Sequence, residues 1–222
     1  YGNTILYTVF GTVFNLALTI PAAYGLSKKT LPGRGIITAL FLITMYFSGG
    51  LVPTYLLVKG LGLINQRITL MILGGISIYN LIVTRVYFTN SIPEDIYEAA
   101  RIDGASEMKS FFRIAVPLAV PIIAVMALYY SVGHWNSYFN AMLYISDREL
   151  EPLQTVLRKV LILNENALDE NMMQELGAGE LLDQAKRAYA AYAMKYSMVF
   201  ISSAPLLIAY PFVQKYFVKG IM

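Results

Sequence analysis

Long apolar stretches alternate with short polar ones along this chain. Five segments are nearly free of charged side chains, namely residues 1–27, 35–58, 68–88, 114–142 and 196–214. Each is about as long as a membrane-spanning helix, which needs roughly 20 predominantly apolar residues. A soluble helical core would require polar faces on its helices, and these segments show almost none. The pattern predicts an all-α, polytopic membrane protein with five spans.

The composition agrees with a membrane protein. Hydrophobic residues make up 57% of the chain and charged residues 14%, whereas about 25% of residues are charged in a typical soluble domain. Cysteine is absent, which excludes a disulfide framework and thiolate metal sites. The single histidine has no set of metal-ligating residues around it, so we predict no metal site. The net charge of +3 does not indicate a nucleic-acid partner.

The distribution of lysine and arginine predicts the orientation of the spans. The loops that fall on one side hold nine such residues, which are Lys28, Lys29, Arg34, Arg85, Arg101, Lys109, Arg113, Lys215 and Lys219. The short loop at 59–67 on the opposite side holds only Lys59 and Arg67. Because positive charge favours the cytoplasmic side, we expect residues 89–117 to form a cytoplasmic loop and residues 143–192 an extracytoplasmic one.

The extracytoplasmic segment is expected to contain helices of its own. Apolar residues recur at helical spacing from Pro152 to Leu163, and a second helix is expected from about Ala178 into the fifth span. Two interpretations of this segment remain open, a solvated cap over the spans and a platform for an external partner.

The cytoplasmic loop has the start and stop signals of two short helices. Ser91 is a candidate cap, with Pro93 in the first turn and Glu94 reaching back. The first helix is expected to run to about Asp103 and to end at Gly104, before Ser106 caps the next helix. Such a unit fits a groove on another protein. An amphipathic loop lying on the membrane surface is the alternative.

This loop resembles the EAA loop of ABC importer permeases. The pattern of that family is EAA, three residues, Gly, nine residues and Ile-x-Leu-Pro. The chain matches it at Glu98, Ala99, Ala100, Gly104, Ile114 and Pro117, and departs from it at Val116. Other stretches are similar to the carbohydrate-uptake branch, the maltose-type and polysaccharide permeases: residues 3–4, 23–27, 53–55, 61–63, 152–154 and 210–217.

The resemblance implies a type I ABC importer transmembrane domain over residues 1–222. It implies six spans in the complete chain, so an N-terminal helix and a short C-terminal tail would lie outside this sequence. The implied partners are a paralogous permease subunit, two ABC ATPase subunits, an extracytoplasmic solute-binding protein and membrane lipid. The implied location is the bacterial cytoplasmic membrane. No cofactor is expected on this chain, and the partner ATPase would bind ATP and Mg.

The same resemblance assigns the coupling to the ATPase to the cytoplasmic loop. The residues that would make this contact are Glu98, Ala99, Ala100, Asp103, Gly104, Ile114 and Pro117. The sequence has no glycine-rich phosphate loop and no nucleophile elbow or zinc helix motif. We therefore expect a non-catalytic subunit.

A sugar, in particular an oligosaccharide, is the substrate that the resemblance implies. Sugars stack on aromatic rings and bond to polar side chains, so the candidates for the pathway are Tyr79, Asn80, Tyr130, Trp135, Asn136 and Tyr138. The alternative is that the aromatic residues near 134–144 form an interfacial belt. His134 is expected to be a hydrogen-bonded structural residue.

Glycine pairs interrupt two of the predicted spans. Gly49-Gly50, followed by Pro53, lies in the second, and Gly74-Gly75 lies in the third. Such positions allow close packing between helices or mark a discontinuous helix that lines a site.

Two other functions remain open alongside an importer. A secondary transporter driven by an ion gradient commonly carries acidic residues inside the membrane. The five predicted spans contain no Asp or Glu, which argues against it. A membrane scaffold or sensor subunit without transport activity is the second alternative.

Overall fold

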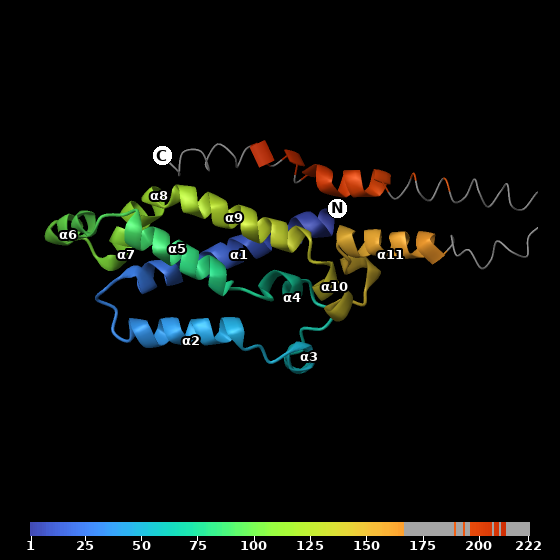
Figure 1. The fold of residues 1–222 in the computed structure, drawn as a ribbon, viewed down its shortest axis with the longest axis horizontal. Helices are drawn as coiled ribbons and strands as arrows, with labels where there is room; N and C mark the ends of the chain where they lie inside the picture. The colour runs from blue at the N-terminus through green and yellow to red at the C-terminus, as the bar shows by residue number, and fades with distance from the viewer. Residues whose placement is uncertain (167–188, 190–192, 194–195, 206, 209, 212–222) are drawn as a thin grey trace, which may run out of the picture.

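The chain is all-helical in a computed structural model, which describes residues 1–166, 189, 193, 196–205, 207–208 and 210–211. The central helix α1 (Gly2–Ser27) packs against α5 (Ile78–Asn90) and α9 (Val120–Trp135), as Figure 1 shows. Their facing sides form the core, where Ala23, Leu81 and Met126 are fully buried. The all-α prediction is confirmed, but several predicted spans are broken.

Only one unbroken helix among the described residues, α1, is both long and apolar enough to cross a membrane. Counting each of two bent helix pairs as one span raises the number to three. The predicted spans over 35–58, 68–88 and 114–142 are therefore not continuous helices, and the discontinuity that the glycine pairs left open is found in the first two. Of the fifth predicted span, residues 196–205 are helical, whereas 212–214 lie outside the described residues.

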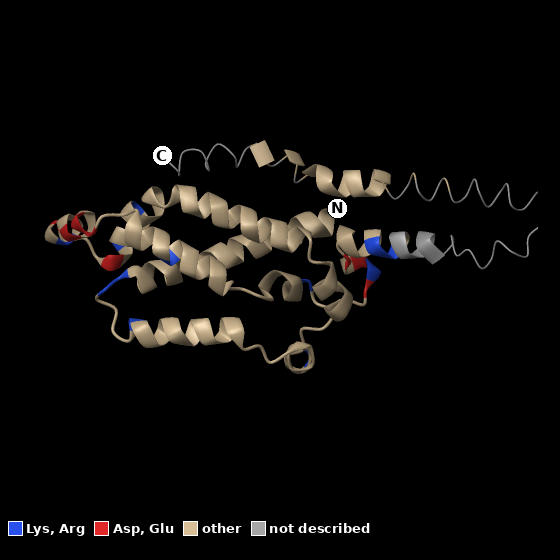
Figure 2. Cartoon of the chain, viewed as in Figure 1, with Lys and Arg blue, Asp and Glu red and all other residues tan. Residues whose placement is uncertain are grey.

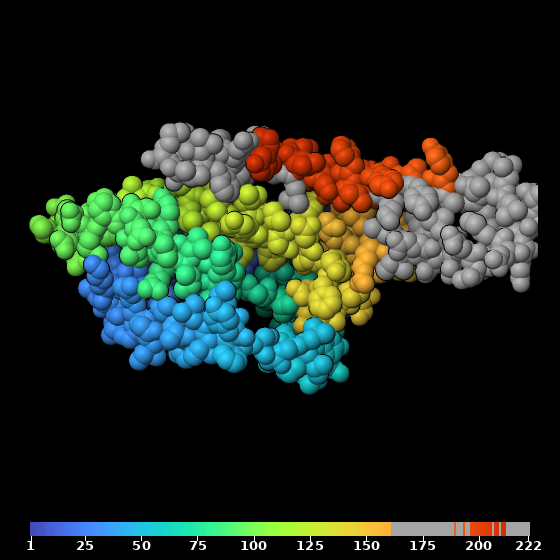
Figure 3. Space-filling model, viewed as in Figure 1, coloured from blue at the N-terminus to red at the C-terminus, as the bar shows by residue number. Residues whose placement is uncertain are grey.

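The second predicted span breaks at a glycine. It consists of α2 (Arg34–Tyr46) and α3 (Leu51–Gly60), which meet at an angle of 111°. Gly50 has φ +88°, a conformation that side chains with a Cβ rarely adopt. Figure 3 shows α2 and α3 along one edge of the molecule.

The third predicted span breaks in the same way. It consists of α4 (Arg67–Ile72) and α5, with Gly74 at φ +73° between them. The hydroxyl of Ser77 accepts a hydrogen bond from the N–H of Asn80 at 3.4 Å, and so caps the first turn of α5. Both glycine pairs thus mark discontinuous helices.

The fourth predicted span bends by 78° between residues 107–118 and α9. Pro117 lacks an N–H, so it cannot bond back to the carbonyl one helical turn earlier. The N–H of Val116 bonds to the carbonyl of Phe111, five residues back, in a π-helical turn (η1, Phe111–Ala115). The short α8 (Val116–Leu118) follows, and Pro121 opens α9.

Hydrogen bonds from the N-terminal part of α1 hold together the end of the molecule where the chain begins. It contains α10 (Tyr138–Tyr144), the 3-10 turn η2 (Arg148–Leu150) and α11 (Leu153–Asn166). The hydroxyl of Tyr7 donates to the carbonyl of Leu150, and Thr4 Oγ1 accepts from the N–H of Leu153, both at 2.8 Å. The predicted helix from Pro152 is confirmed, and the one from Ala178 falls largely outside the described residues.

Charged side chains gather at the two ends of the helical body, with mostly uncharged helix between them (Figure 2). The segment around Lys28 touches the loop that contains Tyr97. At the other end, the N–H of Asn65 donates to the carbonyl of Tyr144 at 2.7 Å. The segments expected to share a side of the membrane thus lie together, and the assignment of one end to the cytoplasm stays a prediction.

Candidate functional site

The first candidate surface is the loop between α5 and α9. It contains α6 (Glu94–Ile102) and α7 (Glu107–Ser110). The prediction that Ser91 caps the first helix is wrong, because Ser91 ends α5 and Pro93 occupies the capping position. Oε1 of Glu94 forms an ion pair at 3.6 Å with Nη2 of Arg101, which lies two turns later on α6. The charge of Glu94 also suits the N-terminal end of a helix dipole.

The elbow between these two helices agrees with the sequence. Gly104 has φ +74°, and its N–H donates to the carbonyl of Arg101 at 3.0 Å. The N–H of Ala105 donates to the carbonyl of Ala100 at 2.8 Å. This bond completes a helix C-terminus in which one residue, here glycine, has left-handed backbone angles. Ser106 accepts a hydrogen bond from the N–H of Lys109 at 3.3 Å. Both predicted roles are confirmed.

The residues predicted to couple to an ATPase differ in exposure. Glu98, Ala99, Asp103, Gly104 and Pro117 are exposed, and Ile114 is half-buried. Ala100 is buried against its own chain, so of the two alanines Ala99 is the one that a partner could approach.

Three apolar residues that the sequence reasoning missed extend the loop surface. Ile102, Met108 and Phe112 expose 87%, 66% and 61% of their surface. Exposed apolar side chains of this size supply contact area for another protein or a membrane. The sequence signal that could have identified these three residues is that each is a large apolar residue in an otherwise polar loop.

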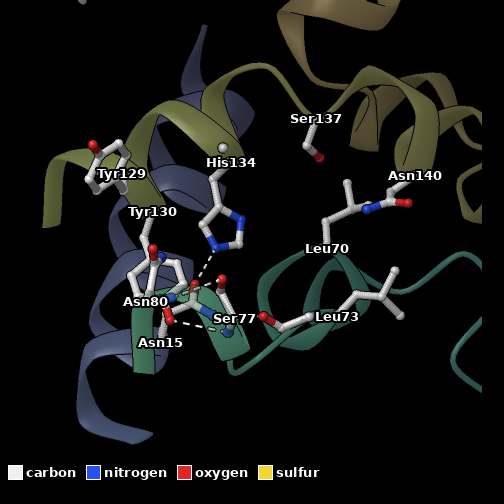
Figure 4. A pocket seen from close by; sticks show the side chains of 12 residues that line it. Asn15, Leu70, Leu73, Ser77, Asn80, Tyr129, Tyr130, His134, Ser137 and Asn140 are labelled. Carbon is white, nitrogen blue, oxygen red and sulfur yellow. Dashed lines mark hydrogen bonds between the residues drawn. The ribbon is translucent and has the colours of Figure 1, made fainter. Parts of the chain in front are cut away.

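The second candidate site is a pocket of about 290 Å³ in the helical body that opens to the outside, called the cavity from here on. Its lining comes from α1, the break between α4 and α5, and the segment from α9 to α10 (Figure 4). The lining residues are Asn15, Leu70, Leu73, Gly74, Ser77, Asn80, Tyr129, Tyr130, Gly133, His134, Ser137 and Asn140. The volume is near the lower end of the range of about 300–1,000 Å³ for small-molecule sites.

Asn15 is the centre of the hydrogen bonds beside the cavity, and it is 1% exposed. Its Nδ2 donates to the carbonyls of Gly74 at 3.1 Å and Gly75 at 2.8 Å. Carbonyls only accept, so Oδ1 of Asn15 must face His134, whose Nε2 lies 2.6 Å away. That nitrogen therefore carries the proton. The expectation that His134 is a hydrogen-bonded residue is confirmed.

Tyr130 makes a second connection beside the first. Its hydroxyl lies 2.7 Å from Oγ1 of Thr19 and accepts a hydrogen bond from the N–H of Ser77 at 3.2 Å. The two connections join α1, α9 and the start of α5. No Lys, Arg, Asp or Glu is among the described residues that line the cavity, so its chemistry suits an uncharged group that forms hydrogen bonds.

The cavity brings together two of the six residues predicted to form the substrate pathway, Asn80 and Tyr130. Tyr79 is exposed, and Nδ2 of Asn136 bonds to the carbonyl of Val132 in its own helix. The indole N–H of Trp135 donates to the carbonyl of Ser202 at 3.1 Å. Tyr138 lies under the guanidinium of Arg158, at 5.3 Å from the ring centroid.

Asn15 and Ser77 are not among the residues predicted from the sequence to line the pathway. The available signal for Asn15 was its position in the middle of an apolar, charge-free segment, where a polar side chain usually faces the protein interior or a water-filled path. Ser77 follows the glycine pair by two positions, and only the broken helix turns it toward the cavity.

Comparisons with known proteins extend over the whole chain. The family described as "Binding-protein-dependent transport system inner membrane component" matches residues 1–222. The protein LplC of Bacillus subtilis (strain 168) is 40% identical over 222 residues, covering 100% of this chain and 71% of LplC. The polygalacturonan/rhamnogalacturonan transport system permease protein YtcP of the same organism is 37% identical over 217 residues, covering 98% of this chain and 72% of YtcP.

A solved structure is similar as well. It is the crystal structure of a bacterial ABC transporter involved in the import of the acidic polysaccharide alginate. The TM-score is 0.82 at 34% sequence identity, over 98% of this chain and 74% of that chain.

Proposed function

The chain belongs to the family of inner membrane components of binding-protein-dependent transport systems, and from this premise we propose which cargo it moves and how. It has the type I ABC importer transmembrane fold and is a non-catalytic permease subunit of an ATP-driven importer. We propose that the cargo is an oligosaccharide, delivered from outside by a solute-binding protein and moved across the bacterial cytoplasmic membrane. The names of YtcP and of the alginate importer support a carbohydrate cargo.

A complete importer of this kind needs further subunits. We propose a paralogous permease beside this chain and two ABC ATPase subunits, which bind ATP and Mg, on the cytoplasmic side. The exposed Ile102, Met108 and Phe112 provide apolar contact area, and Glu98 and Asp103 provide charge, for such an ATPase. In this arrangement residues 89–117 form the coupling loop and residues 143–192 face the binding protein.

The observation that carries the proposed pathway is the uncharged, hydrogen-bonding cavity next to Asn15, Tyr130 and His134. Within the described part of the chain, the side-chain amides of Asn80 and Asn140 line this cavity without engaging a protein hydrogen bond. They are therefore available to sugar hydroxyls. The exposed ring of Tyr129 adds an aromatic face at the same cavity.

The broken helix explains why a polar path exists at this depth. Backbone carbonyls inside a membrane need hydrogen-bond donors. The side-chain amide of Asn15 donates to the carbonyls of Gly74 and Gly75. The helix can therefore open without leaving these groups unsatisfied. Discontinuous helices that line a substrate site are a recurrent feature of transporters.

The first experiment is to purify the tagged full-length protein in a mild detergent and to identify the proteins that accompany it by mass spectrometry. We expect a second permease and an ABC ATPase. Changing Ala99→Asp should release the ATPase, whereas Tyr79→Phe, on an exposed residue outside the loop, should not. Recovery of this permease without an ATPase would contradict the proposed assembly.

The class of substrate is tested by measuring uptake into proteoliposomes that contain the complete importer. Labelled oligosaccharides of polygalacturonate, of alginate and of a neutral sugar such as raffinose are offered together with the binding protein and ATP. ATP-dependent accumulation of at least one of them is expected. Uptake that follows an ion gradient and ignores ATP would overturn the proposal.

A further inference from the structure

The end of α1 that meets the candidate coupling loop holds a buried lysine. Lys28 follows the last turn of α1 and is only 8% exposed. Its Nζ lies 3.0 Å from the ring centroid of Tyr97, on α6, and 4.7 Å from that of Tyr24. In the described part of the chain, no carboxylate oxygen lies within 4.0 Å of this ammonium. The two ring faces therefore take the place of an ion pair.

The rings around Lys28 join the candidate coupling loop to α1. Tyr24 packs edge-on against Tyr97 and Phe88, with ring centroids 5.9 and 5.8 Å apart, respectively. It packs at a tilt against Phe111, with centroids 5.1 Å apart. The hydroxyl of Tyr24 donates to Oε2 of Glu107 at 3.2 Å. One end of α1 thus contacts α5, α6, α7 and the π-helical turn. All of these lie in or next to the loop.

The same helix reaches the cavity. Asn15 and Thr19, which hold His134 and Tyr130, lie on α1 between its outer end and Lys28. Asn15 is about 20 Å from Lys28 along the helix axis, at 1.5 Å per residue. Although Pro21 lies between them, α1 is one unbroken helix. A displacement at Lys28 therefore reaches the cavity without passing through a loop.

We propose that Lys28 and Tyr97 form a clamp that fastens the coupling loop to α1, and that α1 transmits the movement of the loop to the cavity. The inference rests on the proposed function, because it takes residues 89–117 as the segment that the ATPase moves. Lys28 and Tyr97 are positioning residues, since neither lines the cavity.

Burial works against the charged form of Lys28. Burial lowers the pKa of the Lys28 ammonium. The carboxylates of Glu107 and Glu94 raise this pKa in part, and the positive charge of Arg101 lowers it further. The charged form is thus less favourable in the folded protein than in the unfolded one. This penalty is fully present below the folded-state pKa of Lys28 and is relieved as the pH rises from there toward 10.5. Lys28→Met, which keeps the apolar stem, is therefore expected to fold.

The absence of cysteine from the chain provides a direct test. Ser137→Cys places a single thiol at the cavity, and its labelling rate with a water-soluble maleimide is measured on this subunit within the complete importer. The rate is compared without nucleotide and after trapping with ATP and vanadate. We expect trapping to change it about tenfold, within the usual range of coupling between two sites.

The clamp variants are then compared in this background. Lys28→Met and Tyr97→Leu should reduce the change on trapping to about twofold or less while ATP hydrolysis continues. Lys28→Arg and Tyr97→Phe, which keep the cation and the ring, should retain it. Lys29→Met, at the exposed neighbouring lysine, is the matched control.

The outcomes separate the clamp from the proposed function. A full tenfold change in Lys28→Met would overturn the clamp, as would loss of the ATPase from that variant's complex, because Lys28 would then serve assembly of the loop. An unchanged labelling rate on trapping when Lys28 and Tyr97 are intact would instead overturn the assignment of the cavity to the transport path.

Discussion

Nε2 of His134 donates a hydrogen bond to Oδ1 of Asn15 across 2.6 Å, and this contact joins α9 to α1 beside the broken third segment. The other end of the same amide holds the carbonyls of Gly74 and Gly75. A single buried side chain therefore keeps three segments, far apart in the sequence, in register around the cavity.

Replacing Asn15 by alanine removes all three of these hydrogen bonds. At about 1 kcal/mol for each bond, we expect the free energy of unfolding to fall by about 3 kcal/mol. Thermal unfolding of the purified complex in detergent measures this as a lower Tm. Asn136→Ala is the control, because that residue is exposed and its side-chain amide donates only to the carbonyl of Val132 in its own helix. Equal Tm values for the two variants would contradict the role of Asn15.

Gly11 tests the other side of the His134 ring. A Cβ added at Gly11 would lie 2.5 Å from Cε1 and Nε2 of His134, so the ring would have to turn away from Asn15. We expect Gly11→Ala to destabilise the protein by about 1–3 kcal/mol, as overpacking does. Gly25→Ala on the same helix meets nothing within 4 Å and should be neutral or slightly stabilising. A Tm for Gly11→Ala at or above that of Gly25→Ala would argue against a fixed ring position.

Gly104 tests the elbow of the proposed coupling loop. Proline cannot adopt its φ of +74° and lacks the N–H that bonds to the carbonyl of Arg101. We expect Gly104→Pro to hydrolyse ATP while accumulating about tenfold less sugar in proteoliposomes. Gly104→Asn should behave like the unmodified chain, because asparagine tolerates left-handed backbone. Normal ATP-dependent uptake by Gly104→Pro would remove the loop from the coupling path.

Trp135 and Tyr130 are expected to separate stability from transport. Trp135 is 4% exposed and bonds to the carbonyl of Ser202, so Trp135→Ala should lose about 3–5 kcal/mol of stability. The folded fraction should show an unchanged half-saturating sugar concentration. Tyr130→Phe removes a hydroxyl at the cavity and should lower uptake with a smaller change in Tm. The reverse pattern would return Trp135 to the pathway.

Tyr97 gives a pH dependence of known sign. Burial and the carboxylates of Glu94 and Glu107 raise its pKa from 10.0 to about 12. Between these values the unfolded chain releases the proton and the folded chain keeps it, so stability falls as the pH rises. Tyr97→Phe removes this loss, and its Tm should gain on that of the unmodified protein only above about pH 10. A difference that stays constant across this range would show that Tyr97 ionises normally.

The sequence predicts the continuous parts of this fold well and the interruptions poorly. Apolar length alone predicts α1, and helical spacing predicts α11. Gly104 and Ser106 are predictable because left-handed backbone and helix capping each favour a short list of residue types. These features depend on neighbours in sequence, which is the information that a pattern contains.

The breaks depend on contacts that no local pattern contains. The carbonyls of Gly74 and Gly75 can leave the helix because the side-chain amide of Asn15, about sixty residues earlier, donates a hydrogen bond to each of them. Asn80, Tyr130 and Trp135 all carry a polar group inside a predicted span, so the sequence predicts the same role for all three. Only the tertiary contacts show that Trp135 does not line the cavity. Its partner, the carbonyl of Ser202, lies in another helix.

The bend at Gly50 has a consequence for how the molecule sits in the bilayer. An angle of 111° prevents α3 from sharing the direction of α2, and Figure 1 shows α3 nearly end-on beside the lengthwise α2. Leu51, Val52, Leu56 and Leu57 on α3 are exposed, with Lys59 at its end. Residues 34–60 therefore cannot cross a bilayer as one straight helix, and α2 alone, with 13 residues, is shorter than the roughly 20 that a straight span needs.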